Sequence, residues 1–515
     1  MGSAFQPSGS SSLVPRSRGV LDVKGSEITH EVRYLVIGAG LAGLGMALRL
    51  KASGRRDFLV LEKEDEPGGY WRQNGWPDHV SDTPSGLSAF SFAPFRGWAR
   101  KFPTRDDMLT YIRDLVSRYG LMPCIEFNAE VISLRYLSEL ERWQVELRDG
   151  RYLRAEFVML GMGALGRPET PAIAGLERFR GAAFHASQWH SGIDLRERHV
   201  AMVGTGESAI QAAPHVAEQA AAVTLFQKEP AWVLPRQNRA ITAAEKALLS
   251  GTPWLQHRQR QRIFKRQEAQ FSAMTPGSRS HQQAQKRATG YLKKKVANLQ
   301  KRRQLTPVYP IGSRPIRYSD GFYEAVSRDN VRVVDSPVRE VTEHHVIGED
   351  GSRCEADTLI FGTPWRWPDR LIPPGMVLGP GGSDLGRRWQ ANGIESYRGL
   401  FVPGMPNLFL LNGPHTALRH NSPVPMLEAQ YGAVIDCLSH MEQRGLVRFE
   451  VRPEAAEDFA REMRQAAAER VWGSPRQDYL PGRRGGEEAM PLWPHDVQAY
   501  QSMMRAFDSE AFSWR

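Results

Sequence analysis

Two short glycine-rich stretches have the composition and position of phosphate-binding turns. The first, Gly38-Ala39-Gly40-Leu41-Ala42-Gly43, directly follows the apolar run Tyr34–Ile37 and leads into a helix-like run. Glycines at these spacings allow a tight turn and let the backbone approach a pyrophosphate, while the helix start supplies N–H donors. The next apolar run ends at Glu62, whose carboxylate can accept the hydroxyl protons of a ribose. The pattern predicts a dinucleotide site made by Gly38, Gly40, Gly43 and Glu62.

The second stretch, Gly204-Thr205-Gly206-Glu207-Ser208-Ala209, also follows an apolar run and precedes a helix-like segment. The alanine at its third small position still permits close packing of helix on strand. Its next strand-like run is followed by Lys228, a base where the first unit has Glu62. A lysine attracts the 2′-phosphate of NADPH, and a glutamate repels it. We therefore expect FAD at the first turn and NADPH at the second, the latter held by Gly204, Thr205, Gly206, Glu207, Ser208 and Lys228.

The elements that must position these turns are those of an α/β protein. From Val32 onward, short apolar runs alternate with helix-like segments, a pattern typical of buried parallel strands joined by helices. Two such units predict two Rossmann-like dinucleotide-binding domains, and an oxidoreductase that passes hydride from nicotinamide to flavin. We expect a disordered leader over 1–30, an FAD-binding domain over 31–175 and 371–515, and an NADP-binding domain over 176–370 with a helical insertion at about 237–305.

The net charge of +10 belongs to one segment of the chain. Residues 257–303 contain 14 lysines and arginines and a single acid, Glu268, which leaves 53 basic and 56 acidic residues elsewhere. A nucleic-acid-binding flavoprotein is one interpretation of this segment, but it holds few of the aromatic side chains that stack on bases. We favour a solvated face of the helical insertion and expect no nucleic-acid partner.

Other features of the sequence limit its location and partners. No apolar run approaches the ~18 residues of a membrane span, so we expect no integral membrane contact. Cys124, Cys354 and Cys437 lie far apart, which favours neither a disulfide scaffold nor a metal site. We expect a cytoplasmic enzyme without a metal, and the oligomeric state is left open.

Between the two turns, Phe179, Gly181, His185 and Trp189 have the spacing FxGxxxHxxxW. This segment resembles the signature of the Baeyer–Villiger monooxygenases. Related flavin-containing monooxygenases that oxidise nitrogen or sulfur usually end the motif in Tyr or Phe, so Trp189 favours the ketone-oxidising branch. In the family the segment joins the two nucleotide domains and governs their motion. The resemblance therefore implies that His185 organises the domains and does not carry a proton.

Further segments extend the resemblance from about Tyr34 to Phe512. Gly68-Gly69-Tyr70-Trp71, followed by Asp82, is similar to the family's stretch beside the flavin, which implies that Gly69 and Trp71 contact FAD. The resemblance implies that the reduced flavin and molecular oxygen form a C4a-peroxide, which converts a small-molecule ketone to an ester or lactone. Nitrogen or sulfur oxygenation by the protonated peroxide is the alternative.

Ester formation needs a peroxide anion, and a nearby arginine would stabilise it without titrating. A carboxylate beside the arginine would hold it in place, and Asp82 is our candidate. The family's catalytic arginine lies shortly before a helix start that here is Phe322-Tyr323-Glu324. Counting without a gap puts Pro315 in that place and Arg314 where a phosphate-binding lysine should be. With one inserted residue Arg314 becomes catalytic. We favour Arg314, paired with Asp82, and keep Arg317 as the alternative.

Overall fold

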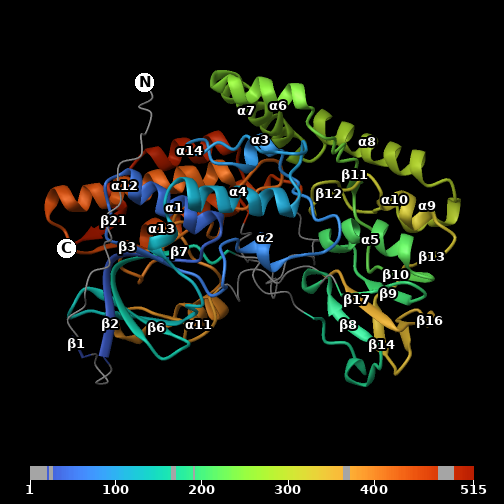
Figure 1. The fold of residues 1–515 in the computed structure, drawn as a ribbon, viewed down its shortest axis with the longest axis horizontal. Helices are drawn as coiled ribbons and strands as arrows, with labels where there is room; N and C mark the ends of the chain where they lie inside the picture. Colours follow the sequence, from blue (N-terminus) through green and yellow to red (C-terminus); the bar gives the residue numbers. More distant parts are fainter. Residues whose placement is uncertain (1–19, 22–26, 164–169, 190–191, 364–371, 474–491) are drawn as a thin grey trace.

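The structure is a computed structural model that describes residues 20–21, 27–163, 170–189, 192–363, 372–473 and 492–515. Figure 1 shows two groups of strands side by side, with the helices of the segment 243–304 above them. One group contains β2 (Glu27–Ile37) and α1 (Leu41–Ala52), which flank the first glycine turn. The other contains β9 (His199–Val203) and α5 (Glu207–Gln219), which flank the second. The two predicted nucleotide sites therefore belong to two separate sheets.

The first sheet has nine strands, built around the parallel pair β2 (Glu27–Ile37) and β7 (Tyr152–Leu160). Its strands run in the order β18-β5-β6-β7-β2-β3-β4, with β1 beside β2 and β19 beside β7. Their bounds are β1 (Val20–Leu21), β3 (Phe58–Leu61), β4 (Ile125–Glu126), β5 (Val131–Leu137), β6 (Arg142–Leu147), β18 (Val377–Leu378) and β19 (Leu408–Leu410). Leu35 and Val36 of β2 are fully buried, because helices cover one face and the β5–β7 meander the other.

The second sheet is entirely parallel, in the order β13-β10-β9-β17-β8. Its strands are β8 (Ala182–His185), β9 (His199–Val203), β10 (Ala222–Phe226), β13 (Val331–Val334) and β17 (Thr358–Phe361). Helices α5 (Glu207–Gln219) and α10 (Phe322–Ser327) pack together beside it. Because all five strands are parallel, their carboxyl ends and the turn before α5 meet at one edge, where ligands of such sheets bind.

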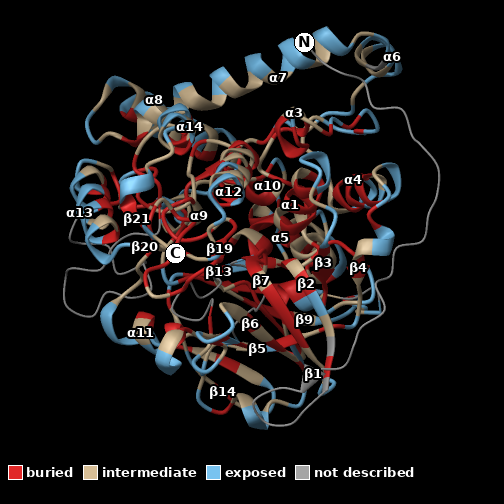
Figure 2. Ribbon diagram, turned by 90° about the vertical axis from the view of Figure 1, so that its left-hand side faces the viewer, coloured by how far each residue is buried: buried red, intermediate tan, exposed pale blue. Residues whose placement is uncertain are grey.

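The chain returns to the first unit after completing the second. Helix α12 (Val424–Arg444) packs against α1 (Leu41–Ala52), and the Tyr431 hydroxyl donates a hydrogen bond to the Ala42 carbonyl at 2.8 Å. Strand β19 extends the first sheet beside β7. Figure 2 shows buried residues concentrated along β2, β7 and α1, so residues from both ends of the chain share one core.

The fold begins earlier than the expected boundary at residue 31. Strand β1 pairs with β2, which starts at Glu27, so the prediction of a disordered leader is wrong for these residues. Ile28 and Val32 are buried, but the three residues between them are polar, so a search for continuous apolar runs overlooks this part of the strand. Residues 1–19 and 22–26 of the expected leader lie outside the described residues.

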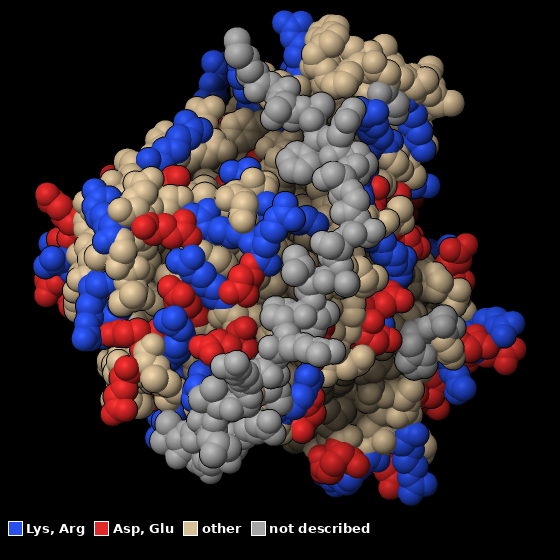
Figure 3. Space-filling model, turned by 60° about the vertical axis from the view of Figure 1, so that its left-hand side comes forward, with Lys and Arg blue, Asp and Glu red and all other residues tan. Residues whose placement is uncertain are grey.

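Helices occupy the segment where the sequence predicts an insertion: α6 (Ala243–Gly251), α7 (Pro253–Glu268), α8 (Arg279–Lys295) and α9 (Leu299–Gln304). Glu268, the single acid of residues 257–303, accepts hydrogen bonds from Asn421 and from the backbone N–H of Val497, which ties α7 to the first unit. The outer residues of α7 are exposed (Figure 2). Figure 3 shows basic side chains gathered near the upper end of the molecule, with basic and acidic side chains interspersed below.

None of the described helices combines the length and apolarity needed to cross a bilayer.

Candidate active site between the two nucleotide-binding turns

The first glycine turn has the close backbone approach that a pyrophosphate site needs. Gly38 has φ +101°, and a Cβ there would lie 2.8 Å from the Gly161 carbonyl oxygen. A Cβ on Gly43 would collide with the carbonyl oxygen of Gly38, so α1 can approach the turn only without a side chain. Gly40 is the N-cap of α1 and has no side chain to cover the helix N-terminus. The turn therefore presents an uncovered helix start, as an anionic ligand requires.

Two further predicted residues lie against this turn. Glu62, buried at the end of β3, accepts hydrogen bonds from the backbone N–H groups of Ala39 (2.6 Å) and Glu64 (3.0 Å). A Cβ on Gly69 would lie 2.8 Å from the Gly40 Cα, so the segment with Trp71 crosses directly over the turn. The donor and acceptor positions fit the pyrophosphate and ribose of FAD.

The second turn repeats this geometry. Gly204 has φ +97°, and a Cβ on Gly206 would collide with the Gly362 carbonyl oxygen at the end of β17. Gly206 is the N-cap of α5, and Ser208 in the first turn of that helix is buried. Thr205 Oγ1 donates a 3.1 Å hydrogen bond to the Glu229 carbonyl, which joins this turn to the segment after β10. The arrangement fits a second dinucleotide.

Lys228 and Arg314 lie together beyond the carboxyl end of β10. Lys228 is exposed, and the neighbouring Glu229 forms an ion pair with Arg314, whose guanidinium carbon lies 4.4 Å from the ring centroid of Tyr309. The expected pair between Asp82 and Arg314 is therefore wrong.

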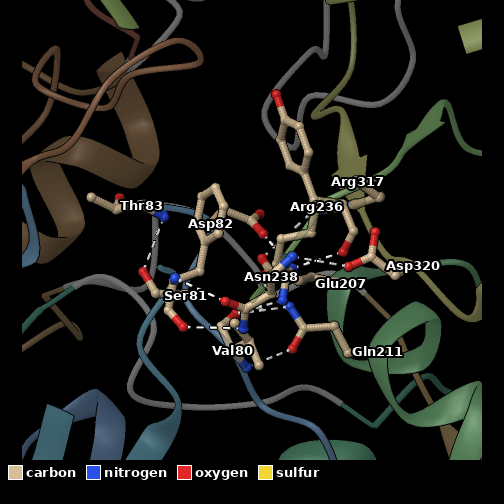
Figure 4. Close-up of polar contacts among 12 residues, drawn as sticks. Val80, Ser81, Asp82, Thr83, Glu207, Gln211, Arg236, Asn238, Arg317 and Asp320 are labelled. Atoms are coloured by element: carbon tan, nitrogen blue, oxygen red, sulfur yellow. Dashed lines mark hydrogen bonds and ion pairs between the residues drawn. The ribbon is translucent and has the colours of Figure 1, made fainter. Parts of the chain in front are cut away.

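The carboxylate of Asp82 pairs with a different arginine. Arg236 Nη2 lies 2.5 Å from Asp82 Oδ1 and 2.7 Å from the Tyr318 carbonyl oxygen, while Nη1 donates to the Val80 carbonyl at 3.3 Å (Figure 4). The Arg236 side chain is only 5% exposed. The sequence analysis did not identify Arg236 as a site residue. The signal that could have identified it is its position at the end of the segment 228–236, directly after Pro235.

Arg317 joins this cluster from β12 (Arg317–Tyr318), which pairs in parallel with β11 (Val233–Leu234). Its Nη1 lies 3.7 Å from Glu207 Oε2, at the first residue of α5. Burial raises the pKa of Asp82, and the charges of Arg236 and Arg317 oppose that rise. Burial and then the charge of Asp82 raise the pKa of Glu207 to about 7, again against both guanidinium groups. Asp82, Glu207, Arg236 and Arg317 therefore form one electrostatic unit, the four-residue cluster.

The amide of Gln211 connects this cluster to both units. Its Oε1 accepts hydrogen bonds from Trp76 Nε1 (3.1 Å) and the Val80 N–H (3.0 Å), and its Nε2 donates to the Val80 carbonyl (3.1 Å). Nε2 also donates to Glu207 Oε1 at 3.1 Å. Helix α5 is thereby joined to the loop that carries Asp82, as Figure 4 shows. The cluster therefore combines side chains that follow the first nucleotide turn with side chains of the second nucleotide-binding unit.

The four spaced residues of the signature segment have structural partners. His185 is fully buried, with Nδ1 2.7 Å from Ser187 Oγ and Nε2 3.2 Å from the Thr363 carbonyl oxygen. Burial lowers its pKa, so the ring is neutral and serves as a hydrogen-bonding bridge. A Cβ on Gly181 would collide with the backbone of Asp357, just before β17. Phe179 packs near that strand, and Trp189 meets Phe184 edge-on at 5.6 Å. The segment thus joins β8 to the end of β17.

Comparisons with known proteins agree with this geometry. Residues 35–293 match the family model described as pyridine nucleotide-disulphide oxidoreductase. A protein of Pseudomonas aeruginosa named Baeyer-Villiger monooxygenase is 34% identical over 93% of this chain and 91% of its own length. A protein of the same name from Streptomyces coelicolor is 36% identical over 87% of this chain and 86% of its own.

Solved structures share the fold over nearly the whole chain. An oxidised steroid monooxygenase bound to NADP superimposes with a TM-score of 0.84 at 25% identity, covering 94% of this chain and 99% of that one. Cyclohexanone monooxygenase from Rhodococcus sp. Phi1 bound to NADP+ gives 0.83 at 24% identity, with the same coverage. The predicted α/β fold with two Rossmann-like domains is confirmed. The chain belongs to the Baeyer–Villiger monooxygenases, flavoproteins that use FAD and NADPH to oxygenate ketones to esters or lactones.

Proposed function

We propose that this chain inserts one atom of molecular oxygen beside the carbonyl of a small-molecule ketone and that Arg317 supplies the catalytic cation. The overall reaction consumes a ketone, O2, NADPH and a proton, and yields an ester or lactone, NADP+ and water. Bound FAD, reduced by NADPH, supplies the oxygen-activating chemistry. The observation that carries the proposal is the four-residue cluster between the two nucleotide turns.

The cluster is suited to stabilise negative charge on a reacting oxygen. A guanidinium stays protonated at all working pH values, and a cation held in a fixed position stabilises a developing anion without having to reorient. Arg236 donates hydrogen bonds to three acceptors, which are the Asp82 carboxylate and the carbonyl oxygens of Val80 and Tyr318. Arg317 lies on the neighbouring short strand, 13% exposed and within electrostatic reach of both carboxylates. We therefore assign the cation to Arg317, with Asp82 and Arg236 as the pair that sets the field around it.

The same geometry supports a role for Arg314 in binding the nucleotide. Lys228 and Arg314 give two cations beyond β10, where the 2′-phosphate of NADPH would lie if the pyrophosphate binds at the N-terminus of α5. Glu229 pairs with Arg314 and would have to release or share it with the phosphate. Lys228 and Arg314 would then decide between NADPH and NADH, and take no part in oxygen transfer.

Replacing Lys228 or Arg314 by alanine should raise the Michaelis constant for NADPH about 10- to 100-fold, because a charge-assisted contact contributes ~1.5–3 kcal/mol. The constant for NADH should change little, since NADH has no 2′-phosphate. Steady-state kinetics with both cofactors measures this. Lys293→Ala, an exposed lysine of α8, is the control and should leave both constants unchanged. Equal losses with NADPH and NADH would remove the residue from the phosphate site.

A cytoplasmic location is part of the proposal. Cys124, Cys354 and Cys437 are free in the structure, and Cys437 is fully buried. Free thiols support a reducing compartment, where disulfides are rare.

The proposed activity is tested by oxidation of NADPH with linear, cyclic and fused-ring ketones. We expect at least one ketone class to raise NADPH consumption above the rate without ketone and to give an ester or lactone by mass. If none of the ketones yields an ester while amines or sulfides are oxygenated, the proposal fails.

A further inference from the structure

Glu207 is placed where a carboxylate affects Arg317 more than the nucleotide. It begins α5, and sequence reasoning counted it among the cofactor-binding residues. Its two oxygens instead face Arg317 Nη1 (3.7 Å) and Gln211 Nε2 (3.1 Å). An acid in the first turn of a helix is favourable in itself, but a bound pyrophosphate would bring a second anion to the same helix end. A role confined to stabilising the helix is therefore a poor explanation for this side chain.

The charges that face Glu207 come from several elements. Asp82 lies on the loop after α2 (Tyr70–Gln73), Arg236 follows β11, and Arg317 is in β12. The Tyr70 hydroxyl is also within electrostatic reach, and burial raises its pKa well above the ordinary value, so it stays neutral. With both carboxylates ionised the two acids balance the two arginines. Protonation of Glu207 would leave the group with a net positive charge and Arg317 with one anion fewer.

We propose that Glu207 is a positioning residue, whose ionised carboxylate holds the Arg317 guanidinium beside Asp82 and whose protonation releases it. The inference rests on the proposed role of Arg317. Gln211 determines the direction of the carboxylate, because it binds Glu207 Oε1 and both backbone polar groups of Val80, two residues before Asp82. An arginine of the NADP-binding unit is thus aligned with a carboxylate of the FAD-binding unit.

This arrangement makes catalysis depend on pH. Burial and the charge of Asp82 raise the pKa of Glu207 to about 7. Above that pH the carboxylate is ionised and holds Arg317, and below it the neutral acid does not. Rising pH has the opposite effect on the stability of the fold. Because the pKa is raised from an ordinary 4.5, the folded state binds more protons than the unfolded state between the two values, so Glu207 lowers stability as pH rises through this window.

The test is Glu207→Gln in the holoenzyme with NADPH and an accepted ketone. In the unmodified protein the fraction of consumed NADPH that ends as ester should rise with pH, with a midpoint at or above about 7, because the bound pyrophosphate adds negative charge beside Glu207. In Glu207→Gln the fraction should be several-fold lower at pH 8 and nearly independent of pH. The melting temperature of the ligand-free variant should exceed that of the unmodified protein above about pH 7, with the difference vanishing near pH 5. If Glu207 only stabilised the fold through its ion pair with Arg317, Glu207→Gln would instead lower the melting temperature above about pH 7.

The control is Glu324→Gln, the same change in the first turn of α10, where the carboxylate pairs with Lys295. It should leave the pH profile of the ester fraction unchanged. The double variant Glu207→Gln/Arg317→Ala should behave as Arg317→Ala alone, because Glu207 acts through Arg317.

The outcomes distinguish the proposed catalytic role of Arg317 from the proposed positioning role of Glu207. If Arg317→Ala keeps its ester yield, the proposed cation is wrong and this inference falls with it. If Arg317→Ala loses the ester but Glu207→Gln keeps the normal yield and pH profile, only the positioning role of Glu207 is overturned. A melting temperature lower at every pH would also overturn it, since Glu207 would then be an ordinary stabilising partner.

Discussion

Arg317→Ala should keep its FAD and consume NADPH, yet yield almost no ester. The loss of one preorganised charge at a reacting oxygen costs ~3–4 kcal/mol, so ester formation should fall about 100-fold or more. The electrons taken from NADPH should appear as hydrogen peroxide instead. Flavin absorbance, peroxide detection and product mass spectrometry on the same sample measure the three quantities. The FAD turn does not depend on Arg317, which lies on the short β11–β12 ribbon.

Arg314→Ala is the matched control, because it removes the same guanidinium three residues earlier in the chain. It should weaken NADPH binding and leave the ester fraction of the consumed NADPH unchanged, since Arg314 pairs with Glu229 and lies over the ring of Tyr309. If Arg314→Ala abolished the ester and Arg317→Ala stayed within a few-fold of normal, the assignment drawn from the ion pairs would be reversed.

Gly43→Ala should give protein without bound FAD. The added methyl would collide with the Gly38 carbonyl oxygen and come within 3.1 Å of Val36 Cγ1, so α1 would have to move away from β2 and the turn would open. Overpacking of this kind costs ~1–3 kcal/mol, and here the strain falls on the backbone that must contact the pyrophosphate. The ratio of flavin absorbance to protein absorbance measures the loss.

Gly432→Ala is the control for a glycine-to-alanine change in the same unit. It lies in α12, and a Cβ there meets nothing within 4 Å. It should retain FAD and gain slightly in stability, because alanine favours a helix over glycine. Full FAD content in Gly43→Ala would show that the close approach of α1 to the turn is not needed for the cofactor.

The nucleotide turns were predictable because their signal is local. A strand, a glycine turn, a helix and an acid follow one another within about 30 residues, and backbone geometry alone requires that order. Glu62 lies where the spacing placed it, against the N–H of Ala39. Asp149-Gly150 is also a local turn signal, and it connects β6 to β7.

The arginine cluster could not be predicted in the same way. Arg236 meets the Tyr318 carbonyl across 82 positions, because β11 and β12 pair in parallel after a long helical insertion. Spacing along the chain does not reveal which of Arg314 and Arg317 faces Asp82. The choice of Arg314 rested on an assumed inserted residue, whereas the pairing of β11 with β12, which sets the position of Arg317, is a contact between distant segments. The same holds for Glu207, whose partner Arg317 lies in that ribbon.

The most direct measurement is the fate of labelled oxygen. The purified holoenzyme is supplied with NADPH, an accepted ketone and 18O2, and the product is analysed by mass spectrometry. The account predicts an ester or lactone that contains a single 18O atom, formed in proportion to the NADPH consumed. Complete conversion of the consumed NADPH to labelled hydrogen peroxide, or an oxygenated nitrogen or sulfur product with every ketone left intact, would contradict it.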